Sequence, residues 1–269
     1  MGTLDPDNVF GTFGAGTVLV GEHGEILPTV TSTMDVARER LLEGVPDGYT
    51  VLAEQQTAGR GREGGWECPH GLGILMTVVL QIRLSRAEQN QITMMGAVAG
   101  AEALGSLGVP ARIKWPNDIV MAAKNGGPVQ KLGGVLVERV KTDDAAAPFL
   151  LGMGLNVNQQ REELPADTPL PATSMQLVKG SPFDRTRVCR ALLREVDRWY
   201  RRLRMGQPER IMARWRRLSC LLNRRVRVRT DGRLLRGTVL GLRSTGELIF
   251  RRDDGEKMIL SEEKTKLLL

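Results

Sequence analysis

The chain has 269 residues, of which 41% are hydrophobic and 26% are charged, and its formal net charge is +7. This composition supports a folded core in one large domain, or in one domain with a small appendage. No run of 18 apolar residues occurs, which argues against a membrane span, and no Lys or Arg precedes Arg38, which argues against a signal peptide. Cys68, Cys189 and Cys220 are far apart and lack metal-binding spacing, so they predict reduced thiols in a cytoplasmic protein.

The positive charge is concentrated in one segment. Residues 185–229 contain sixteen arginines, against the three acids Glu195, Asp197 and Glu209. A basic segment of this kind is compatible with nucleic-acid binding. Helical spacing explains most of these arginines as a solvent-exposed face, so we expect no specific DNA binding. A third interpretation is electrostatic steering of an acidic protein partner, with Arg201 and Arg202 as the residues to test.

The first third of the chain predicts an irregular arm, short strands and one helix. The arm covers residues 1–16. Ser32 or Thr33 precedes a helical pattern from Met34 to Leu42 and suits the N-cap position. A hydroxyl at a helix N-terminus also faces any anion bound there, so capping and ligand contact are both expected. Strands are expected at 18–20, 26–30 and 49–53.

A loop rich in glycine and arginine follows the last of these strands. Residues 53–66 read A-E-Q-Q-T-A-G-R-G-R-E-G-G-W. Glycines let backbone N–H groups come close to a ligand, and arginines bind carboxylate or phosphate through two parallel hydrogen bonds. The loop therefore predicts a site for an anionic ligand, held by backbone amides and by Arg60 and Arg62. The alternative is a flexible, solvated loop.

Residues 59–64 also match G-x-G-x-x-G, the dinucleotide-binding fingerprint. That interpretation requires a helix directly after the glycines, with the pyrophosphate at its N-terminus. The run from Ile74 to Leu80 is instead rich in strand-forming residues, so the loop joins two strands. A Walker A loop fails as well, because no Gly-Lys-Ser/Thr follows.

Beyond this loop, polar residues interrupt otherwise apolar strands. Ser85 is expected to cap a helix from Arg86 to about Gly105. Pro116 divides residues 111–121 into two strands, beside Lys114, Asn117 and Asp118, which turn chemistry does not explain as a group. A hairpin loop is expected at 122–130, strands at 131–138 and 149–158, and a long polar loop at 159–172.

The spacing of apolar residues changes in the last part of the chain. Two amphipathic helices are expected, the first with an apolar stripe from Val188 to Leu203 and the second opening at Pro208. From Arg225 onward the period is two, with turns at Asp231-Gly232, Thr245-Gly246 and Asp254-Gly255. Residues 222–269 therefore predict a small barrel of about five strands.

Five stretches carry the unusual polar residues and glycines, and in this order and spacing they resemble the catalytic domain of biotin protein ligases. The match covers roughly residues 30–260 and includes G-R-G-R-x-G, K-W-P-N-D and K-L-x-G. The five stretches are Ser32-Thr33, Gln56–Trp66, Lys114–Asp118, Lys131–Gly134 and Gly152–Asn156.

The resemblance implies an α+β fold of two domains. Residues 1–220 would form a mixed β-sheet packed with helices, as in class II synthetases, and residues 221–269 a small SH3-like β-barrel. It also implies a two-step reaction, in which biotin and ATP give biotinyl-5′-AMP and pyrophosphate. A lysine of a biotin carboxyl carrier domain then takes the biotin and releases AMP. Mg²⁺ is the expected companion of ATP, and the resemblance leaves a homodimer open.

The same resemblance assigns roles to residues of this chain. Lys131, Arg60 and Arg62 would be catalytic. Asp118 would orient Lys114 or act on a metal through water. Biotin would contact Ser32, Thr33, Gln56, Gly59, Arg60, Lys131, Gly134, Gly152 and Leu155. The adenylate would contact Arg60, Arg62, Trp66, Lys114, Asn117, Lys131 and Asn156.

Two departures from the family pattern affect these roles. The family usually has Ser-Thr-Asn where this chain has Ser32-Thr33-Met34, so one polar contact is expected to be missing. The spacing from Gly59 to Trp66 is one residue short, which leaves the role of Trp66 open. About 30 residues precede Ser32, too few for a winged helix-turn-helix, so a ligase without operator binding is expected. The alternative within the fold is a lipoate or octanoate ligase or transferase.

Overall fold

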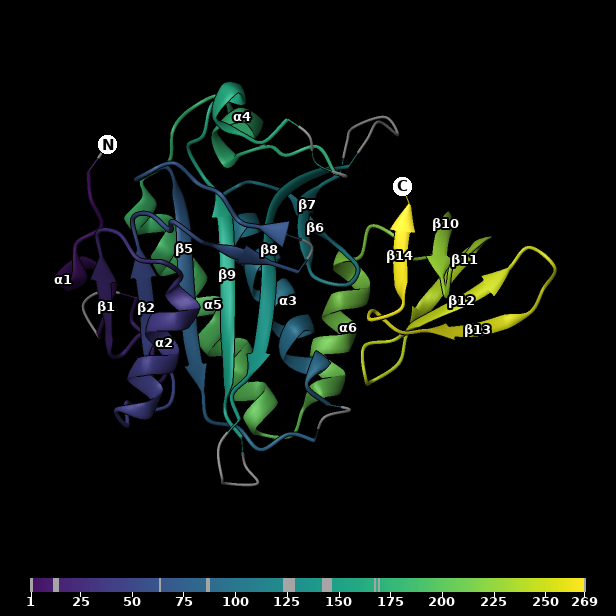
Figure 1. The fold of residues 1–269 in the computed structure, drawn as a ribbon, viewed down its shortest axis with the longest axis horizontal. Coiled ribbons are helices and arrows are strands. Elements are labelled where there is room, and N and C mark those ends of the chain that lie inside the picture. Colours follow the sequence, from purple (N-terminus) through teal and green to yellow (C-terminus); the bar gives the residue numbers. More distant parts are fainter. Residues whose placement is uncertain are drawn as a thin grey trace.

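The computed structural model describes residues 2–11, 15–62, 64–85, 88–122, 129–141, 147–166, 168 and 170–268. Its centre is a seven-stranded mixed sheet in the order β1-β2-β5-β9-β8-β7-β6 (Figure 1). β1 runs parallel to β2, and the other neighbouring pairs are antiparallel. The strands are β1 (Gly24–Leu27), β2 (Thr50–Ala53), β5 (Gly73–Leu80), β6 (Ala111–Lys114), β7 (Asp118–Met121), β8 (Gln130–Arg139) and β9 (Phe149–Asn156).

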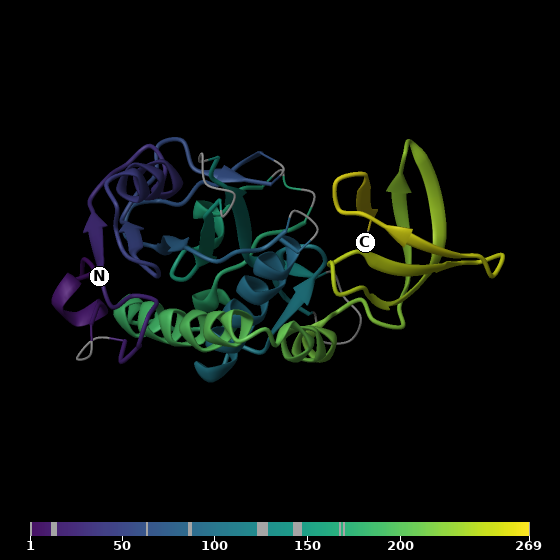
Figure 2. The same ribbon diagram turned by 90° about the horizontal axis from the view of Figure 1, so that it is seen from below.

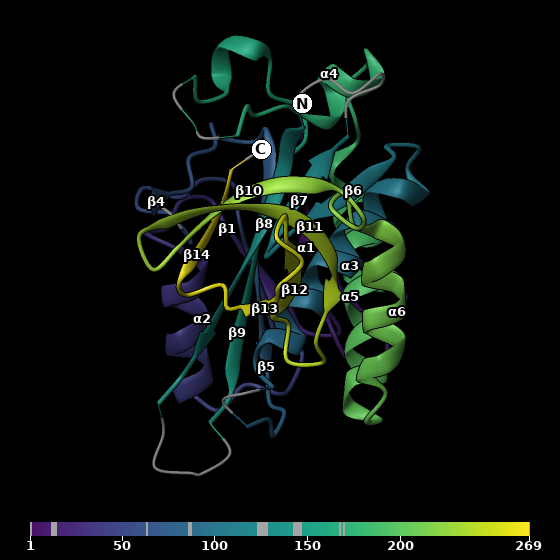
Figure 3. The ribbon, with the colours of Figure 1, turned by 90° about the vertical axis from the view of Figure 1, so that its right-hand side faces the viewer.

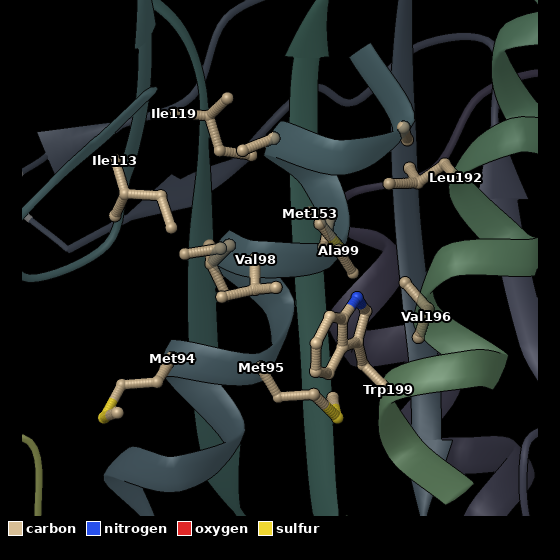
Figure 4. Close-up of a cluster of buried hydrophobic side chains, with 14 of the residues drawn as sticks. Met94, Met95, Val98, Ala99, Ile113, Ile119, Met153, Leu192, Val196 and Trp199 are labelled. Carbon is tan, nitrogen blue, oxygen red and sulfur yellow. The ribbon is translucent and has the colours of Figure 1, made fainter. Parts of the chain in front are cut away.

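Three long helices cover one face of this sheet: α3 (Asn90–Ser106), α5 (Arg185–Arg204) and α6 (Pro208–Leu218) (Figure 2). Small residues let α3 lie close to the strands. A Cβ on Gly96 would meet Leu151 and Val135, and one on Gly100 would meet Ile119. Figure 4 shows the resulting core, in which α3 side chains pack against strands and α5. Its labelled residues are Met94, Met95, Val98, Ala99, Ile113, Ile119, Met153, Leu192, Val196 and Trp199, all buried.

The other face carries α2 (Thr33–Leu42) and the glycine–arginine loop (residues 59–66), which contains the two-residue strands β3 (Arg60–Gly61) and β4 (Gly64–Gly65). Here a second apolar cluster packs Met34 and Ala37 of α2 against Val51, Val79 and Leu150 of the sheet. No helix starts at the glycines, because β3 and β4 pair with each other and β5 follows. The prediction that the loop joins two strands is confirmed.

The C-terminal part forms a separate five-stranded antiparallel sheet in the order β13-β12-β11-β10-β14. Figure 3 views the molecule from the end that carries it. Its strands are β10 (Arg225–Thr230), β11 (Arg233–Leu242), β12 (Leu248–Arg252), β13 (Lys257–Leu260) and β14 (Thr265–Leu268). Along β10 burial alternates strictly, with Val226 and Val228 buried and the arginines exposed. The expected five strands are confirmed, and the domain boundary that we propose, between residues 220 and 221, lies between α6 and β10.

Several boundaries differ from the prediction. No strand covers residues 18–20, and α3 begins at Asn90 rather than at Arg86. Ser85 does not cap α3; its Oγ and backbone N donate to Glu88 instead. The helices α1 (Pro6–Val9) and α4 (Met175–Lys179) and the 3₁₀ turn η2 (Arg161–Glu163) were not expected. Most of the hairpin loop expected at 122–130 lies outside the described residues, as do Arg86 and Glu63.

Candidate functional site

Two adjoining cavities lie between the α2 side of the sheet and the glycine–arginine loop. The larger has a volume of about 210 Å³ and the smaller about 40 Å³. Five residues line both: Gly61, Arg62, Trp66, Asn117 and Lys131. The larger cavity is also lined by Lys114, Asp118 and Asn156. The smaller cavity is also lined by Ser32, Thr33, Gln56, Arg60, Gly134 and Gly152. The structure therefore brings together most of the residues that the sequence assigned to a site.

A buried hydrogen-bond chain forms one side of the smaller cavity. Gln56 Oε1 accepts from the Thr33 backbone N at 2.8 Å and from Thr33 Oγ1 at 2.9 Å. The hydroxyls of Thr33 and Thr77 lie 2.8 Å apart. Ser32 caps α2, since its Oγ accepts from the Met34 backbone N at 3.3 Å. The N-terminus of α2 is thereby fixed against β5 and against Gln56, which precedes the glycine–arginine loop.

Glycines on β8 and β9 let large side chains lie flat on the sheet. A Cβ on Gly154 would clash with the indole of Trp66, and one on Gly134 would lie 3.8 Å from that ring. A Cβ on Gly152 would lie 3.0 Å from Met34 Sδ. Trp66 thus covers the junction of the two cavities, and its buried Nε1 has no hydrogen-bond partner within the part of the chain that the structure describes.

The two loop arginines bond to opposite sides of the site. Arg60 forms a forked pair with Asp35 of α2, at 2.8 and 3.0 Å, and its Nε lies 3.5 Å from Glu138 of β8. Arg62 Nη2 donates to the backbone O of Glu262 at 2.6 Å. The hydrogen bond from Arg60 lowers the pKa of Asp35, against a smaller opposing effect of burial. The glycine–arginine loop is therefore tied to the central sheet at one arginine and to the C-terminal part at the other.

A charged triad lies beside the larger cavity. Asp118 accepts from Lys131 Nζ at 2.7 Å and from Lys114 Nζ at 2.8 Å, and Lys131 Nζ is 5.6 Å from the centroid of the Trp66 ring. Burial would raise the pKa of Asp118, but the two lysine charges and their hydrogen bonds outweigh it and lower that pKa. Asp118 thus holds Lys131 at the boundary between the cavities.

The two predicted asparagines have mainly local partners. Asn117 Nδ2 donates to the Val135 backbone O at 2.7 Å, which ties the β6–β7 turn to β8. Asn156 Nδ2 donates to the Thr173 backbone O at 3.0 Å, and its Oδ1 accepts from Gln159 at 3.3 Å. Both still line the larger cavity. Their hydrogen bonds hold its walls in place.

Leu155, which was expected to contact biotin, lies away from both cavities. Side chains alternate along β9, so Gly152 and Gly154 face the cavities and Leu155 faces the helices. It is fully buried in the main core, and its Cδ2 lies 2.5 Å from where a Cβ on Gly133 would be. Its side chain is not part of the lining of either cavity.

The family resemblance also implies that Asp118 acts on a metal through water. Both of its oxygens already accept hydrogen bonds from lysines, and two ammonium groups repel a cation. Among the described residues no group of three or more His, Cys, Asp or Glu side chains is placed to hold a metal ion. Asp118 is therefore placed as the ion-pair partner of two lysines rather than as a dedicated metal ligand.

Some site residues were missed from the sequence. Thr77 had a usable signal, since it is a hydroxyl inside the apolar run of β5. No sequence signal indicated Asp35 and Glu138, the partners of Arg60, because these two residues come from separate elements. The contribution of β14 to the larger cavity, through Thr265, Lys266 and Leu267, was not expected either.

Comparison with known proteins places the chain in a family. The profile of the Biotin/lipoate A/B protein ligase family matches residues 26–158. The bifunctional ligase/repressor BirA of Bacillus spizizenii is 30% identical over 253 residues, which cover 93% of this chain and 76% of that protein. A biotin--[acetyl-CoA-carboxylase] ligase of Paracoccus denitrificans is 28% identical over 238 residues, covering 87% of this chain and 96% of the relative.

Solved structures agree with the sequence relatives. A biotin protein ligase from Aquifex aeolicus, in complex with biotin and ATP, has a TM-score of 0.73 and 25% identity, covering 91% of this chain and 98% of that one. In the part of the chain that the structure describes, no helix has the length and apolarity needed to cross a membrane. The shared sequence and fold show that the chain belongs to the Biotin/lipoate A/B protein ligase family.

Proposed function

We propose that the chain is an ATP-dependent biotin protein ligase. It forms biotinyl-5′-AMP from biotin and ATP and then transfers biotin to a lysine of a biotin carboxyl carrier domain. The observation that carries this proposal is the sorting of residues between the two cavities. Seven of the nine residues assigned to biotin line the smaller cavity, all except Gly59 and Leu155. Six of the seven assigned to the adenylate line the larger one, all except Arg60, and Lys131 and Arg62 lie at both.

The smaller cavity suits a neutral, hydrogen-bonding head group. The Thr33 hydroxyl and the Gln56 amide line this cavity and supply donors and acceptors for the ureido ring of biotin, and the Thr77 hydroxyl holds that of Thr33 in place. Gly134 and Gly152 leave room above the sheet, and Met34 and Trp66 supply apolar walls.

The junction of the cavities is where charge changes in the first step. The biotin carboxylate oxygen attacks the α-phosphorus of ATP, and the bond to the β-phosphate breaks as pyrophosphate leaves. Lys131 is held there by Asp118, so its ammonium can neutralise the carboxylate and the charge that develops on the α-phosphate. Mg²⁺ is expected only as part of the MgATP substrate, where its chemistry would be to offset negative charge on the phosphate oxygens.

The second step requires the adenylate to stay bound until the acceptor arrives. The lysine amine attacks the carbonyl carbon of the mixed anhydride, and AMP leaves. Arg60 and Arg62 secure the two sides of the glycine–arginine loop, which supports a role in retaining the adenylate. We also propose that residues 1–220 carry these groups and that residues 221–269 complete the larger cavity.

Incubation with biotin, ATP and Mg²⁺, followed by mass spectrometry under native conditions, tests the proposal. A bound biotinyl adenylate and biotin-dependent release of pyrophosphate are the expected results. The same assay with lipoate and with octanoate is the matched control, since both are handled by ligases or transferases of this fold. Activity with lipoate or octanoate and none with biotin would contradict the proposal.

A further inference from the structure

One face of the C-terminal sheet carries an unusual array of cations. Its exposed positions include Arg227 and Arg229 of β10, Arg236 of β11, Arg251 of β12, Lys257 of β13 and Lys266 of β14. The registers place them in directly opposed like-charge pairs. The pairs are Arg227 with Arg236, Arg229 with Lys266, and Arg251 with Lys257. We call these six residues the basic face.

The pairing scheme of the basic face disfavours a purely structural explanation. Like charges directly opposite each other across strands destabilise a sheet, whereas opposite charges stabilise it. The nearby acid Asp253 is already paired with Arg225, at 2.6 and 3.1 Å. Repulsion between Arg227 and Arg236, and between Arg251 and Lys257, is therefore retained in the folded chain, and an external acidic surface would relieve it.

The basic face is continuous with the candidate active site. Lys266 lines the larger cavity together with Thr265 and Leu267 of the same strand. Its cross-strand neighbour on the exposed side is Arg229. A partner that covers the basic face therefore reaches the mouth of the cavity where the adenylate is proposed to lie.

Two exposed apolar side chains favour a protein over a nucleic acid as this partner. Leu234 lies opposite Arg229 and is 51% exposed, and Ile259, two residues from Lys257, is 47% exposed. Arginines interleaved with apolar side chains are typical of protein interfaces. Single-stranded nucleic acid usually stacks on exposed aromatic rings, whereas Phe250, the aromatic residue of this sheet, is buried.

The arginines of α5 are less suitable for the same task. They belong to the helix layer on the far face of the central sheet from the cavities (Figure 2). Arg201 is already paired with Asp197, and Arg204 with Asp47. Arg202 stacks on Trp199, with its guanidinium carbon 4.6 Å from the ring centroid. Steering by Arg201 and Arg202, as considered from the sequence, is therefore the weaker hypothesis.

We propose that the basic face docks the acceptor protein, through an acidic surface beside the lysine that receives biotin. This inference rests on the proposed ligase function, since it names the surface that recognises the second substrate. Charges at such a surface speed the encounter and orient the acceptor before its lysine enters the larger cavity.

The double substitution Arg227→Glu with Arg236→Glu tests the docking directly. It keeps a like-charge pair across the strands, so repulsion within the sheet is preserved while its sign is reversed. We expect kcat/KM for an isolated biotin carrier domain with an acidic surface to fall about tenfold or more at low ionic strength, with the difference shrinking as salt is added. Formation of biotinyl-AMP without the carrier should not change.

A matched control keeps the same change of net charge but places it elsewhere. Arg216→Glu with Arg217→Glu alters two exposed arginines of α6, and it should leave carrier kinetics nearly unchanged. Equal losses in the two double variants would overturn the proposal. So would loss of duplex DNA binding in the Arg227/Arg236 variant with carrier kinetics intact. Absence of biotinyl-AMP formation in the wild type would instead contradict the ligase function itself.

The single substitution Arg236→Glu separates docking from stability. It converts the repulsive pair with Arg227 into an attractive one, so the thermal midpoint should rise while kcat/KM for the carrier falls. A residue with only a structural role would not lower carrier kinetics as stability increases. A higher midpoint with unchanged carrier kinetics would show that the basic face is not the docking surface.

Discussion

Lys131 Nζ lies 2.7 Å from Asp118 Oδ1, and this ion pair fixes an ammonium group between the two cavities. Asp118 also accepts from Lys114, so its carboxylate stays in place when either lysine moves toward a ligand. Such a preorganised cation stabilises charge that develops during a reaction without a cost for reorientation at that moment.

Lys131→Ala should therefore lower adenylate synthesis by about 10²–10³-fold, the usual effect of removing one preorganised donor. Biotin binding should largely survive, because the Thr33, Gln56 and Thr77 hydrogen bonds remain. Pyrophosphate release and calorimetric biotin binding measure the two effects separately. Lys179→Ala, at the exposed end of α4, is the control and should change neither. A parallel loss of binding and synthesis would assign Lys131 to binding alone.

Asp118→Asn should destabilise the protein in a pH-dependent way. Burial opposes the charge on Asp118, but Lys114 and Lys131 lower its pKa overall, below the unfolded value of about 4. A lowered carboxylate pKa stabilises the fold above the unfolded pKa, and this stabilisation is lost as pH falls through the folded pKa. We expect a loss of about 2–3 kcal/mol at pH 7, between the values for exposed and buried pairs.

Urea unfolding of the wild type and of the Asp118→Asn variant at pH 7 and at a pH below the unfolded carboxyl pKa checks this. The difference between the two free energies of unfolding should be smaller at the acidic pH, because the stabilisation from the Asp118 carboxylate declines as the pH falls toward its lowered pKa. A difference that is the same at both pH values would mean that packing, rather than charge, causes the loss.

Arg62→Gly should loosen retention of the adenylate. The hydrogen bond from Arg62 to the Glu262 backbone O ties the glycine–arginine loop to the C-terminal part, and glycine removes both this bond and the positive charge. Biotinyl-AMP should dissociate faster, and bystander lysines of an unrelated protein should become biotinylated. Arg62→Lys keeps the charge without the planar fork and should give an intermediate rate. Tight retention in the glycine variant would contradict this role.

The central strands of the large sheet were predictable because each one is marked by a continuous run of apolar residues. β5 and β9 are continuous apolar runs, and the sequence located both to within about two residues. The predicted start of α3 was wrong because the Ser85 hydroxyl donates to Glu88 instead of capping the helix, which begins at Asn90. The short helices α1 and α4 contain too few residues for a helical period to show.

The composition of the candidate site was more predictable than its connections. Thr33 and Gln56 were grouped by their motifs, yet nothing local indicates that Gln56 Oε1 accepts from Thr33. The pairing of Arg60 with Asp35 spans 25 positions, and the bond from Arg62 to Glu262 spans 200. Such contacts depend on how separate elements pack, which no periodicity in one segment encodes.

Gly154→Ala tests whether the position of the Trp66 indole on the sheet matters for biotin binding. An added methyl group would clash with the indole ring, so Trp66 must shift away from the junction of the cavities. We expect an altered tryptophan emission spectrum and weaker biotin binding. Gly105→Ala is the matched control, because nothing lies within 4 Å of its added Cβ and it sits inside α3.

The control should gain about 0.5–1 kcal/mol of stability, since alanine favours a helix interior over glycine. The Gly154 variant should lose stability as well as affinity, because β9 is a central strand flanked by β5 and β8. Unchanged emission and biotin affinity in Gly154→Ala would mean that Trp66 already leaves this position in solution. In that case the indole would not form the wall of the smaller cavity that the proposed biotin site requires.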